Sequence, residues 1–190
     1  MKYAALVAAL LALSASAAVA QDPLPKVTFG EPGYGGSGCP DGTAQVIRGF
    51  SNQAAIYILN AYKVGDNGRA VDRQTCAVAI PVEVPNGVSV AIRSVAIRGT
   101  AKLPDGLDAT VSVEAFTAST QGEINEVPLN GAMDTGYLRF VTIPDDKLQW
   151  SACGADTNLR INTSLRTRGD KQAAVSLTAL IVYPLATKAC

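Results

Sequence analysis

Apolar and polar residues alternate with a period of two along much of this chain. This pattern is typical of β-strands that turn one face to a core and the other to water. From Ala109 to Ala115 the odd positions are apolar and the even ones polar, and Leu159–Arg166 alternates in the same way. Ala173–Tyr183 is apolar on both faces. We therefore expect this last stretch at the centre of a sheet.

The stretch Val88–Arg98 changes phase part-way along. Its apolar residues fall on even positions up to Ile92 and on odd positions from Val95. A slip of one residue moves every following side chain to the opposite face. The slip at Arg93-Ser94 thus predicts either a bulge or a strand that crosses between two sheets.

Turn signals separate the strand-like stretches at short intervals. Gly65-Asp66-Asn67-Gly68 contains the Asn-Gly pair that is typical of a β-hairpin. The polar stretch Thr117–Met133 is expected to be a long surface loop. With no long helical period in the chain, the pattern predicts an all-β fold, a disulfide-stapled antiparallel β-sandwich in a single domain.

A glycine-rich stretch, Phe29–Pro40, lies near the start of this predicted domain. Five of its twelve residues are glycine, and it contains Cys39. Glycine loses the most backbone entropy on ordering and proline lacks an N–H donor, so neither a helix nor a regular strand is expected here. We expect a rigid, closely packed loop that is held at Cys39.

The first 20 residues have the features of a secretory signal peptide. Lys2 precedes the apolar run Ala4–Leu13, and Ala18-Val19-Ala20 fits a small-residue cleavage site. The apolar run is too short to span a membrane, and no later transmembrane segment is expected. The predicted mature chain is one β-sandwich domain, residues 21–190, with a Gly/Pro-rich N-terminal part at 21–42. We expect it to be secreted, or periplasmic in a bacterium.

The charge balance narrows the range of partners. The chain has 16 basic and 16 acidic residues. Removing the signal peptide removes Lys2 alone, which leaves 15 basic against 16 acidic residues and a net charge of −1. A nearly neutral chain argues against nucleic acid or an anionic membrane surface as the main partner.

The four cysteines, an even number in a chain predicted to be exported, indicate two disulfides. Three pairings are possible. We favour Cys39–Cys76 and Cys153–Cys190, since each closes a segment of the same span, 76 − 39 = 37 and 190 − 153 = 37. A zinc site is the competing interpretation, but no cysteines have C-x-x-C spacing and the chain contains no histidine.

The absence of histidine also excludes Ser-His-Asp and Cys-His catalysis. Glycoside hydrolysis needs only two carboxylates. Candidates for such a pair are Glu31, Glu83, Glu114, Asp145 and Asp146. Acidic residues on strands and turns are ordinarily solvated, so we expect no catalytic residue and no cofactor.

Three further sites are candidates for binding or modification. Tyr34 and Trp150, together with Tyr57 and Tyr62, could stack on sugar rings, although Trp150 also fits packing against the Cys153 bridge. Oxygen ligands from Asp66, Asn67 and Asp72 could bind calcium, but turn geometry alone accounts for them. Asn162-Thr163-Ser164 is a glycosylation sequon that a eukaryotic host could use.

Several motifs in order resemble one family. Gly35-Gly36-Ser37-Gly38-Cys39-Pro40 resembles the N-terminal hallmark of the DUF4360 family of secreted proteins. The remaining motifs that agree are Asp72-Arg73-Gln74-Thr75 before Cys76, the strand Arg93–Gly99, Trp150-Ser151-x-Cys153-Gly154, and Leu159-Arg160-Ile161-Asn162 leading to Leu165-Arg166. The family occurs in fungi and bacteria and has no assigned biochemical function. The resemblance implies export, disulfides and one β domain, and it implies no catalytic residue.

These observations lead to one expected function and two rivals. We expect a non-catalytic extracellular binding or structural protein, whose unknown partner is a glycan, a surface or matrix, or a second copy of itself. One rival is a carboxylate-dependent polysaccharide hydrolase. The other is a small carbohydrate-binding module with a flat patch around Tyr34 or Trp150.

Overall fold

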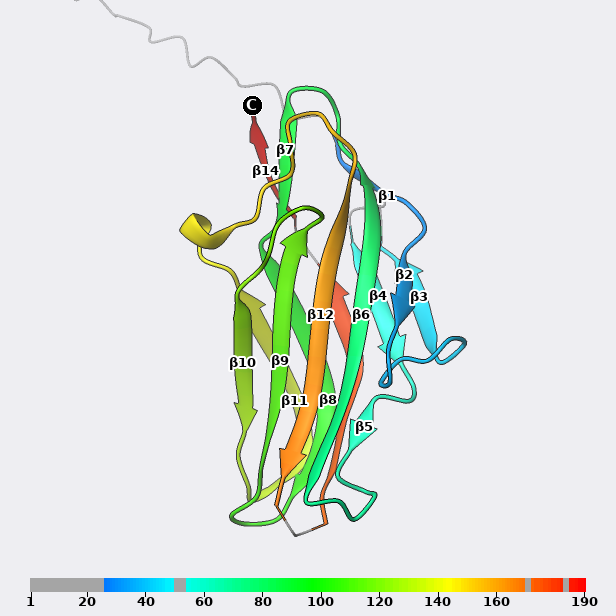
Figure 1. The fold of residues 1–190 in the computed structure, drawn as a ribbon, viewed down its shortest axis with the longest axis vertical. Helices are drawn as coiled ribbons and strands as arrows, with labels where there is room; N and C mark the ends of the chain where they lie inside the picture. The colour runs from blue at the N-terminus through cyan, green and yellow to red at the C-terminus, as the bar shows by residue number, and fades with distance from the viewer. Residues whose placement is uncertain (1–25, 50–53, 170–171, 183–184) are drawn as a thin grey trace, which may run out of the picture.

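The protein is a β-sandwich of two antiparallel six-stranded sheets (Figure 1). The computed structural model describes residues 26–49, 54–169, 172–182 and 185–190. The predicted signal peptide lies outside these residues. Successive strands pass repeatedly from one sheet to the other, so residues far apart in sequence meet in both layers.

The sheet nearer the viewer in Figure 1 is called the front sheet. Its main path runs in the order β1-β6-β12-β9-β10, and β2 also pairs with β6. The strands are β1 (Thr28–Phe29), β2 (Gly33–Gly35), β6 (Val71–Glu83), β9 (Asp108–Thr117), β10 (Ile124–Leu129) and β12 (Thr157–Arg168).

The second layer, the back sheet, runs in the order β11-β8-β13-β4-β3, with β5 also paired to β13. Its strands are β3 (Ala44–Arg48), β4 (Ala55–Leu59), β5 (Lys63–Val64), β8 (Ser94–Leu103), β11 (Met133–Thr142) and β13 (Ala174–Val182). A small third sheet pairs β7 (Val88–Ile92) with β14 (Leu185–Ala189) at the end that carries the C-terminus (Figure 1). The 3₁₀ helix η2 (Asp145–Lys147) precedes β12.

The core lies between the two sheets and follows the predicted alternation. The odd positions of β9 and most odd positions of β12 are buried, while their even positions face outward. Leu159, Ile161 and Leu165 are fully buried and share one cluster with Leu177 and Leu180 of β13. Each such side chain contributes about 1.5–3 kcal/mol on burial. The doubly apolar β13 is central in its sheet, as expected.

The phase slip at Arg93 marks a crossing between sheets. β7 ends at Ile92 and pairs with β14, whereas β8 begins at Ser94 and pairs with β11 and β13. The crossing alternative predicted from the sequence is therefore confirmed. All five residues of β7 are buried, because this strand caps the end of the sandwich.

Three local predictions were wrong. The stretch Thr117–Met133 contains the edge strand β10, whose inward Val127 and Leu129 follow polar residues and are separated by Pro128. The turn at Gly65–Gly68 is not a hairpin between neighbouring strands, since β5 pairs with β13 and β6 pairs in the front sheet. The glycine-rich stretch includes a short strand, β2, where no regular strand was expected.

Both disulfides are formed in the favoured pairing, Cys39–Cys76 and Cys153–Cys190. The first lies inside the core cluster and joins the glycine-rich segment to β6. The second joins the turn before β12 to the last residue, whose N–H also donates to the Gly87 carbonyl at 3.0 Å.

Tyr57 and Tyr62 are both fully buried but differ in their hydroxyl contacts. The Tyr57 hydroxyl has no hydrogen-bond partner within the described part of the chain. The Tyr62 hydroxyl lies 3.2 Å from the Thr163 hydroxyl and 3.3 Å from the Gln74 carbonyl. Burial raises the pKa of Tyr62 to about 12, so this hydroxyl keeps its proton at neutral pH.

We expect Tyr57→Phe to stabilise the protein and Tyr62→Phe to destabilise it. An unsatisfied buried hydroxyl costs about 1–3 kcal/mol, whereas a satisfied one contributes about 0.5–1.5 kcal/mol. Urea unfolding of the two variants, monitored by circular dichroism, measures both changes. A Tyr57→Phe variant that loses as much stability as Tyr62→Phe would contradict this assignment of the two hydroxyls.

A polar groove on the outer face of the front sheet

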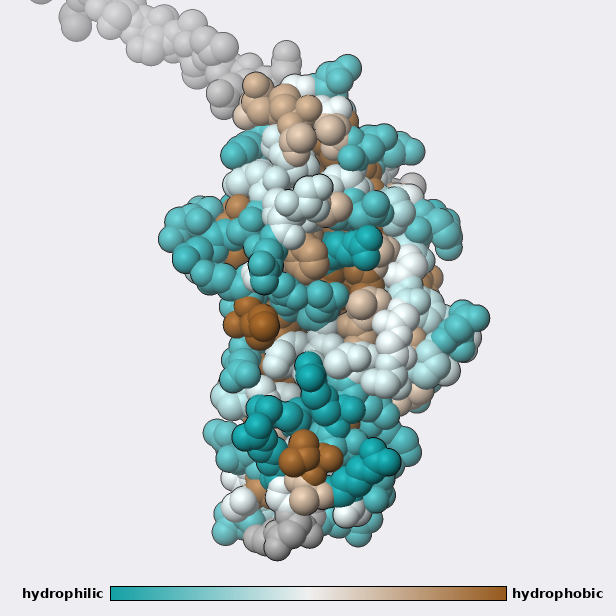
Figure 2. Space-filling view, viewed as in Figure 1, coloured by the Kyte–Doolittle hydropathy of each residue, from teal (hydrophilic) through white to brown (hydrophobic). Residues whose placement is uncertain are grey.

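The outer face of the front sheet carries a groove of about 510 Å³, here called the sheet groove. Figure 2 views this face and shows pale, small residues next to strongly hydrophilic ones. The groove crosses β6, β12, β9 and the start of β10, and the glycine-rich segment borders it. Its lining is Gly35, Gly36, Arg73, Thr75, Cys76, Ala77, Ser112, Glu114, Ile124, Asn162, Thr163 and Ser164.

Small side chains in register make the groove. Thr75, Ser164 and Ser112 stand opposite one another on β6, β12 and β9. In the adjacent row, Gly35 is opposite Ala77. Residues directly opposite on an antiparallel ladder lie about 4.5–5.5 Å apart on one face, so these small residues leave a shallow continuous hollow.

Two hydrogen bonds fix the polar side chains of the groove. The Asn162 amide nitrogen donates to a Glu114 carboxylate oxygen at 2.9 Å. The Arg73 Nε donates to the Ser164 hydroxyl at 2.9 Å. Within the described residues, the remaining guanidinium N–H groups of Arg73 and the second oxygen of Glu114 have no other hydrogen-bond partner and can bind a ligand.

The glycine-rich segment is locked against β6 and forms one side of the groove. The Gly38 N–H donates to the Thr75 carbonyl at 2.8 Å, and the Thr75 N–H donates to the Ser37 hydroxyl at 3.0 Å. Gly36 has φ +144°, and a Cβ there would lie 2.3 Å from the Thr75 carbonyl oxygen. Only glycine fits at this close approach. The closely packed, Cys39-linked segment thus has a direct role in shaping the groove.

The predicted stacking residues do not form one platform. Tyr34 packs against the core, and its hydroxyl donates to the Ala44 carbonyl at 3.1 Å. Trp150 borders a depression of about 320 Å³ near the C-terminus, with Lys188 Nζ 4.1 Å from its ring centroid. The burial of Tyr57 and Tyr62 removes them from any binding surface.

The three calcium candidates have separate partners. Asp66 forms an ion pair with Lys63 at 2.7 Å, and the hydrogen bond from Lys63 lowers the pKa of the Asp66 carboxyl. Asn67 accepts from the Arg69 N–H, and the buried Asp72 accepts from the Gly65 N–H. These contacts account for all three as turn-forming residues. The residues that the structure describes contain no group of three or more metal-ligating side chains.

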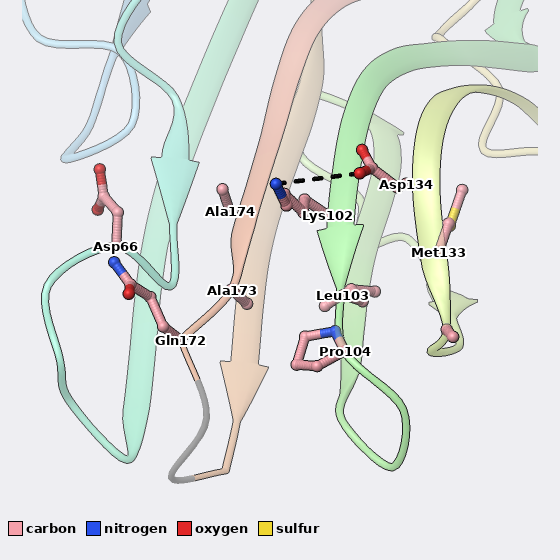
Figure 3. A pocket seen from close by; sticks show the side chains of 10 residues that line it. Asp66, Lys102, Leu103, Pro104, Met133, Asp134, Gln172, Ala173 and Ala174 are labelled. Atoms are coloured by element: carbon pink, nitrogen blue, oxygen red, sulfur yellow. Dashed lines mark ion pairs between the residues drawn. The ribbon is translucent and has the colours of Figure 1, made fainter.

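A second hollow, of about 580 Å³, lies at the end of the sandwich opposite the C-terminus, between β8, β11 and the start of β13 (Figure 3). Lys102 and Asp134 form an ion pair at 4.0 Å on one side, and Asp66 and Gln172 stand on the other. Leu103, Pro104, Met133, Ala132, Ala173 and Ala174 complete the lining. Apart from the Lys102–Asp134 ion pair, the polar groups of this end pocket stand apart from one another, whereas the sheet groove contains two hydrogen-bonded pairs of side chains.

Residues 25–182 match the model of DUF4360, described as a domain of unknown function. The chain belongs to this family. An uncharacterized secreted protein of Arthroderma benhamiae (strain ATCC MYA-4681 / CBS 112371) is 32% identical over 151 residues, which are 76% of this chain and 61% of the relative. The chain therefore spans about three fifths of that relative's length.

Two solved structures show a weaker likeness. One is TmCBM61 in complex with β-1,4-galactotriose, with TM-score 0.29, 13% identity, and coverage of 86% of this chain and 91% of that one. The other is the enzymatically active domain of bacteriophage CBA120 tailspike protein 4, with TM-score 0.27, 7% identity, and coverage of 84% and 19%. At these TM-scores neither likeness supports an inference about this DUF4360 protein.

Most groove residues were missed by sequence reasoning. Glu114 and Asn162 were named for other reasons, as a carboxylate and as a glycosylation site, and the structure brings them together. Asn162 is exposed on β12, so a glycan attached there would occupy the groove. Ser112 and Ser164 are ordinary polar positions in alternating strands, and only strand order and register show that they are neighbours. Within the described residues no helix is long and apolar enough to cross a membrane.

Proposed function

We propose that this DUF4360 protein is an exported, non-catalytic binding protein whose sheet groove holds a carbohydrate chain outside the cell. The observation that carries the proposal is the pre-ordered set of hydrogen-bonding side chains around a floor of small residues. Arg73, Asn162 and Glu114 offer both donors and acceptors, as a chain of sugar hydroxyls requires. The groove is open on its outer side, which suits a polymer.

An apolar side chain stands beside these polar groups. Ile124, at the start of β10, is 69% exposed and lines the groove next to Glu114. Binding sites combine apolar surface with a few placed polar groups, and sugar rings present both kinds of surface. Ile124 thus provides a contact for the C–H groups of a sugar ring while its neighbours bind hydroxyls.

Export is supported by the disulfides and by the relative. Disulfides persist in oxidising compartments outside the cytosol. The two bridges here are both intact, and the Arthroderma relative is described as secreted. A binding protein with these features would act in the periplasm, at the cell surface or in the surrounding medium.

The non-catalytic part of the proposal depends on the carboxylates. Among the described residues, Glu114 is the only carboxylate that lines the groove, and it already accepts from Asn162. Glu126 is its diagonal neighbour on β10 and lies outside the lining. Cα atoms of diagonal neighbours in a ladder are about 7–8 Å apart. Hydrolysis needs an acid and a second carboxylate on opposite sides of the sugar linkage. Because the nearest second carboxylate, Glu126, lies outside the lining, the groove supports binding rather than hydrolysis.

A bulky side chain on the floor of the sheet groove is expected to weaken glycan binding. Ala77 is exposed on the groove floor, and Ala174 is exposed in the end pocket, so Ala77→Tyr and Ala174→Tyr are a matched pair. On a glycan array followed by calorimetry, we expect the wild type and Ala174→Tyr to bind the same glycan. We expect Ala77→Tyr to bind it at least about ten-fold more weakly, a change of ~1.4 kcal/mol.

Other results of these experiments would favour a different binding site or a hydrolase. Loss of binding in Ala174→Tyr alone would move the site to the end pocket. Release of reducing ends by the wild type but not by Glu114→Gln would make the protein a hydrolase. A wild type that binds no glycan would contradict the proposed function.

A second candidate function, self-association, is favoured by an apolar row on the outer face of the back sheet. The row crosses five strands in register and is most exposed at its two ends, where Phe140 is 69% and Ile47 is 50% exposed. Its members are Phe140, Ala96, Ile181, Ile56 and Ile47. Sedimentation velocity distinguishes the two functions, since a carbohydrate-binding monomer sediments as one species at all concentrations.

A further inference from the structure

The two central strands of the front sheet carry a strip of arginines on their outer face. Arg73 projects from β6, and Arg160, Arg166 and Arg168 project from β12. We call these four residues the basic strip. Figure 2 shows a concentration of strongly hydrophilic residues over the lower half of this face. Arg73 also lines the sheet groove, so the strip and the groove are continuous.

The arginines of the strip form no ion pairs within the described residues, whereas basic residues elsewhere on the protein do form ion pairs. Asp108 is directly opposite Arg168 in the β12–β9 register, and the other acidic groups on this face have hydrogen-bond partners of their own or lie at its margins. Glu114 accepts from Asn162, Asp108 accepts from the Gly131 N–H, Glu83 accepts from Thr28 at the far end of β6, and Glu126 is on the edge strand β10.

Two of the arginines are placed against each other. Arg73 and Arg166 are directly opposite in the β6–β12 register. Like charges directly opposite in a sheet are destabilising, so the pair costs stability in the free protein. The chain as a whole is nearly neutral, with 16 basic and 16 acidic residues. The strip is thus a local feature and not a consequence of a basic composition.

We propose that the carbohydrate bound in the sheet groove is an acidic polysaccharide, whose carboxylate or sulfate groups pair with the basic strip. This inference rests on the proposed function. Guanidinium groups bind such anions through paired N–H donors. Arg166 and Arg168 are two residues apart on one strand, which separates their Cα atoms by about 6.4–6.8 Å. Charges repeated along a polymer can therefore meet successive arginines.

The test uses polygalacturonate and its methyl ester, which share a backbone and differ in charge. We expect the wild type to bind polygalacturonate at least about ten-fold more tightly than the ester, and to lose affinity as sodium chloride rises from about 0.05 to 0.5 M. Dextran sulfate against dextran makes the same comparison for sulfate. The preferred anion shows which of the two groups the strip binds.

Substitution of the arginines tests whether the basic strip binds polygalacturonate. Each arginine is expected to contribute about a 2- to 5-fold change in affinity, so Arg166→Gln with Arg168→Gln should weaken polygalacturonate binding about 4- to 25-fold. The matched control is Arg98→Gln with Arg139→Gln, two exposed arginines of the back sheet, which should leave binding unchanged. Thermal unfolding of both double variants checks that they fold.

Each negative result would overturn a different part of the proposal. Equal binding to polygalacturonate and its ester, abolished by Ala77→Tyr, would overturn the acidic-ligand inference and leave the proposed function standing. Binding to polygalacturonate that survives Ala77→Tyr, or that falls equally in both arginine double variants, would overturn the placement on the strip and groove. Failure to bind any charged or neutral glycan would overturn the proposed function itself.

Discussion

Replacing Cys39 and Cys76 together with alanine is expected to lower the free energy of unfolding more than the same replacement at Cys153 and Cys190. Both bridges close segments with a sequence separation of 37, so the chain-entropy loss is the same, about 4 kcal/mol. Such a loss is a large part of the ~5–15 kcal/mol that holds a typical domain folded.

The two bridges differ in burial. Cys39 and Cys76 are 0% and 2% exposed and belong to the core cluster, whereas Cys153 and Cys190 are exposed. Deleting a buried heavy atom adds about 0.5–1.5 kcal/mol through lost packing. We therefore expect a loss of about 5–7 kcal/mol for the inner bridge, against about 4 kcal/mol for the outer one.

Guanidinium unfolding of the two double variants, monitored by tryptophan fluorescence and circular dichroism, measures this difference. The outer pair is the control, because it has the same loop length without the burial. An inner variant already unfolded in buffer, beside a folded outer variant, agrees with the expectation. Equal losses, or a larger loss for the outer pair, would show that the burial of the Cys39–Cys76 bridge adds nothing to its contribution.

The second large effect is expected at Gly38, in the glycine-rich segment. A Cβ at this position would lie 2.2, 2.4 and 2.7 Å from three ring carbons of Tyr62. The Tyr62 ring is fully buried and its hydroxyl contacts Thr163, so it has no free direction in which to move. Overpacking of this kind costs typically 1–3 kcal/mol and occasionally more, and we expect about 3 kcal/mol for Gly38→Ala.

Gly33→Ala is the matched control in the same segment. A Cβ at Gly33 meets nothing within 4 Å, and Gly33 does not have a positive φ. Alanine there reduces the entropy of the unfolded chain, so stability should stay unchanged or rise by up to about 1 kcal/mol. Thermal and urea unfolding of both variants give the comparison. If the two variants have the same midpoint, the segment is not packed on Tyr62 as described.

Much of the fold follows from the period-two pattern. The alternation in β9 and β12 identifies both strands and their buried faces, and the slip at Arg93 marks the crossing from β7 to β8. β10 was missed because only two of its apolar residues, Val127 and Leu129, point inward. An edge strand needs little apolar surface, so its sequence pattern is weak. The hairpin at Asn67-Gly68 was misassigned because a turn signal does not specify which strands pair on either side of it.

The site was much less predictable. Tyr34 and Trp150 were chosen as stacking candidates because they are aromatic. Tertiary packing, which a single sequence does not show, places Tyr34 against the core and Trp150 at a separate depression. The sheet groove consists of residues that are individually ordinary. Its hydrogen bonds join positions separated by 48 and 91 residues in sequence, Glu114 with Asn162 and Arg73 with Ser164. A single sequence shows which way each residue points along its strand, but not which strand lies beside it.

The most direct test is an NMR titration of the ¹⁵N-labelled, oxidised protein with a galacturonate oligosaccharide. The account predicts that amide shifts concentrate at Ala77, Ser112 and Ser164 in the groove and extend to Arg166, while Lys102 and Ala174 in the end pocket stay unchanged. A spectrum unaffected by both this oligosaccharide and its methyl ester, or one whose shifts gather around Lys102 and Ala174, would contradict it.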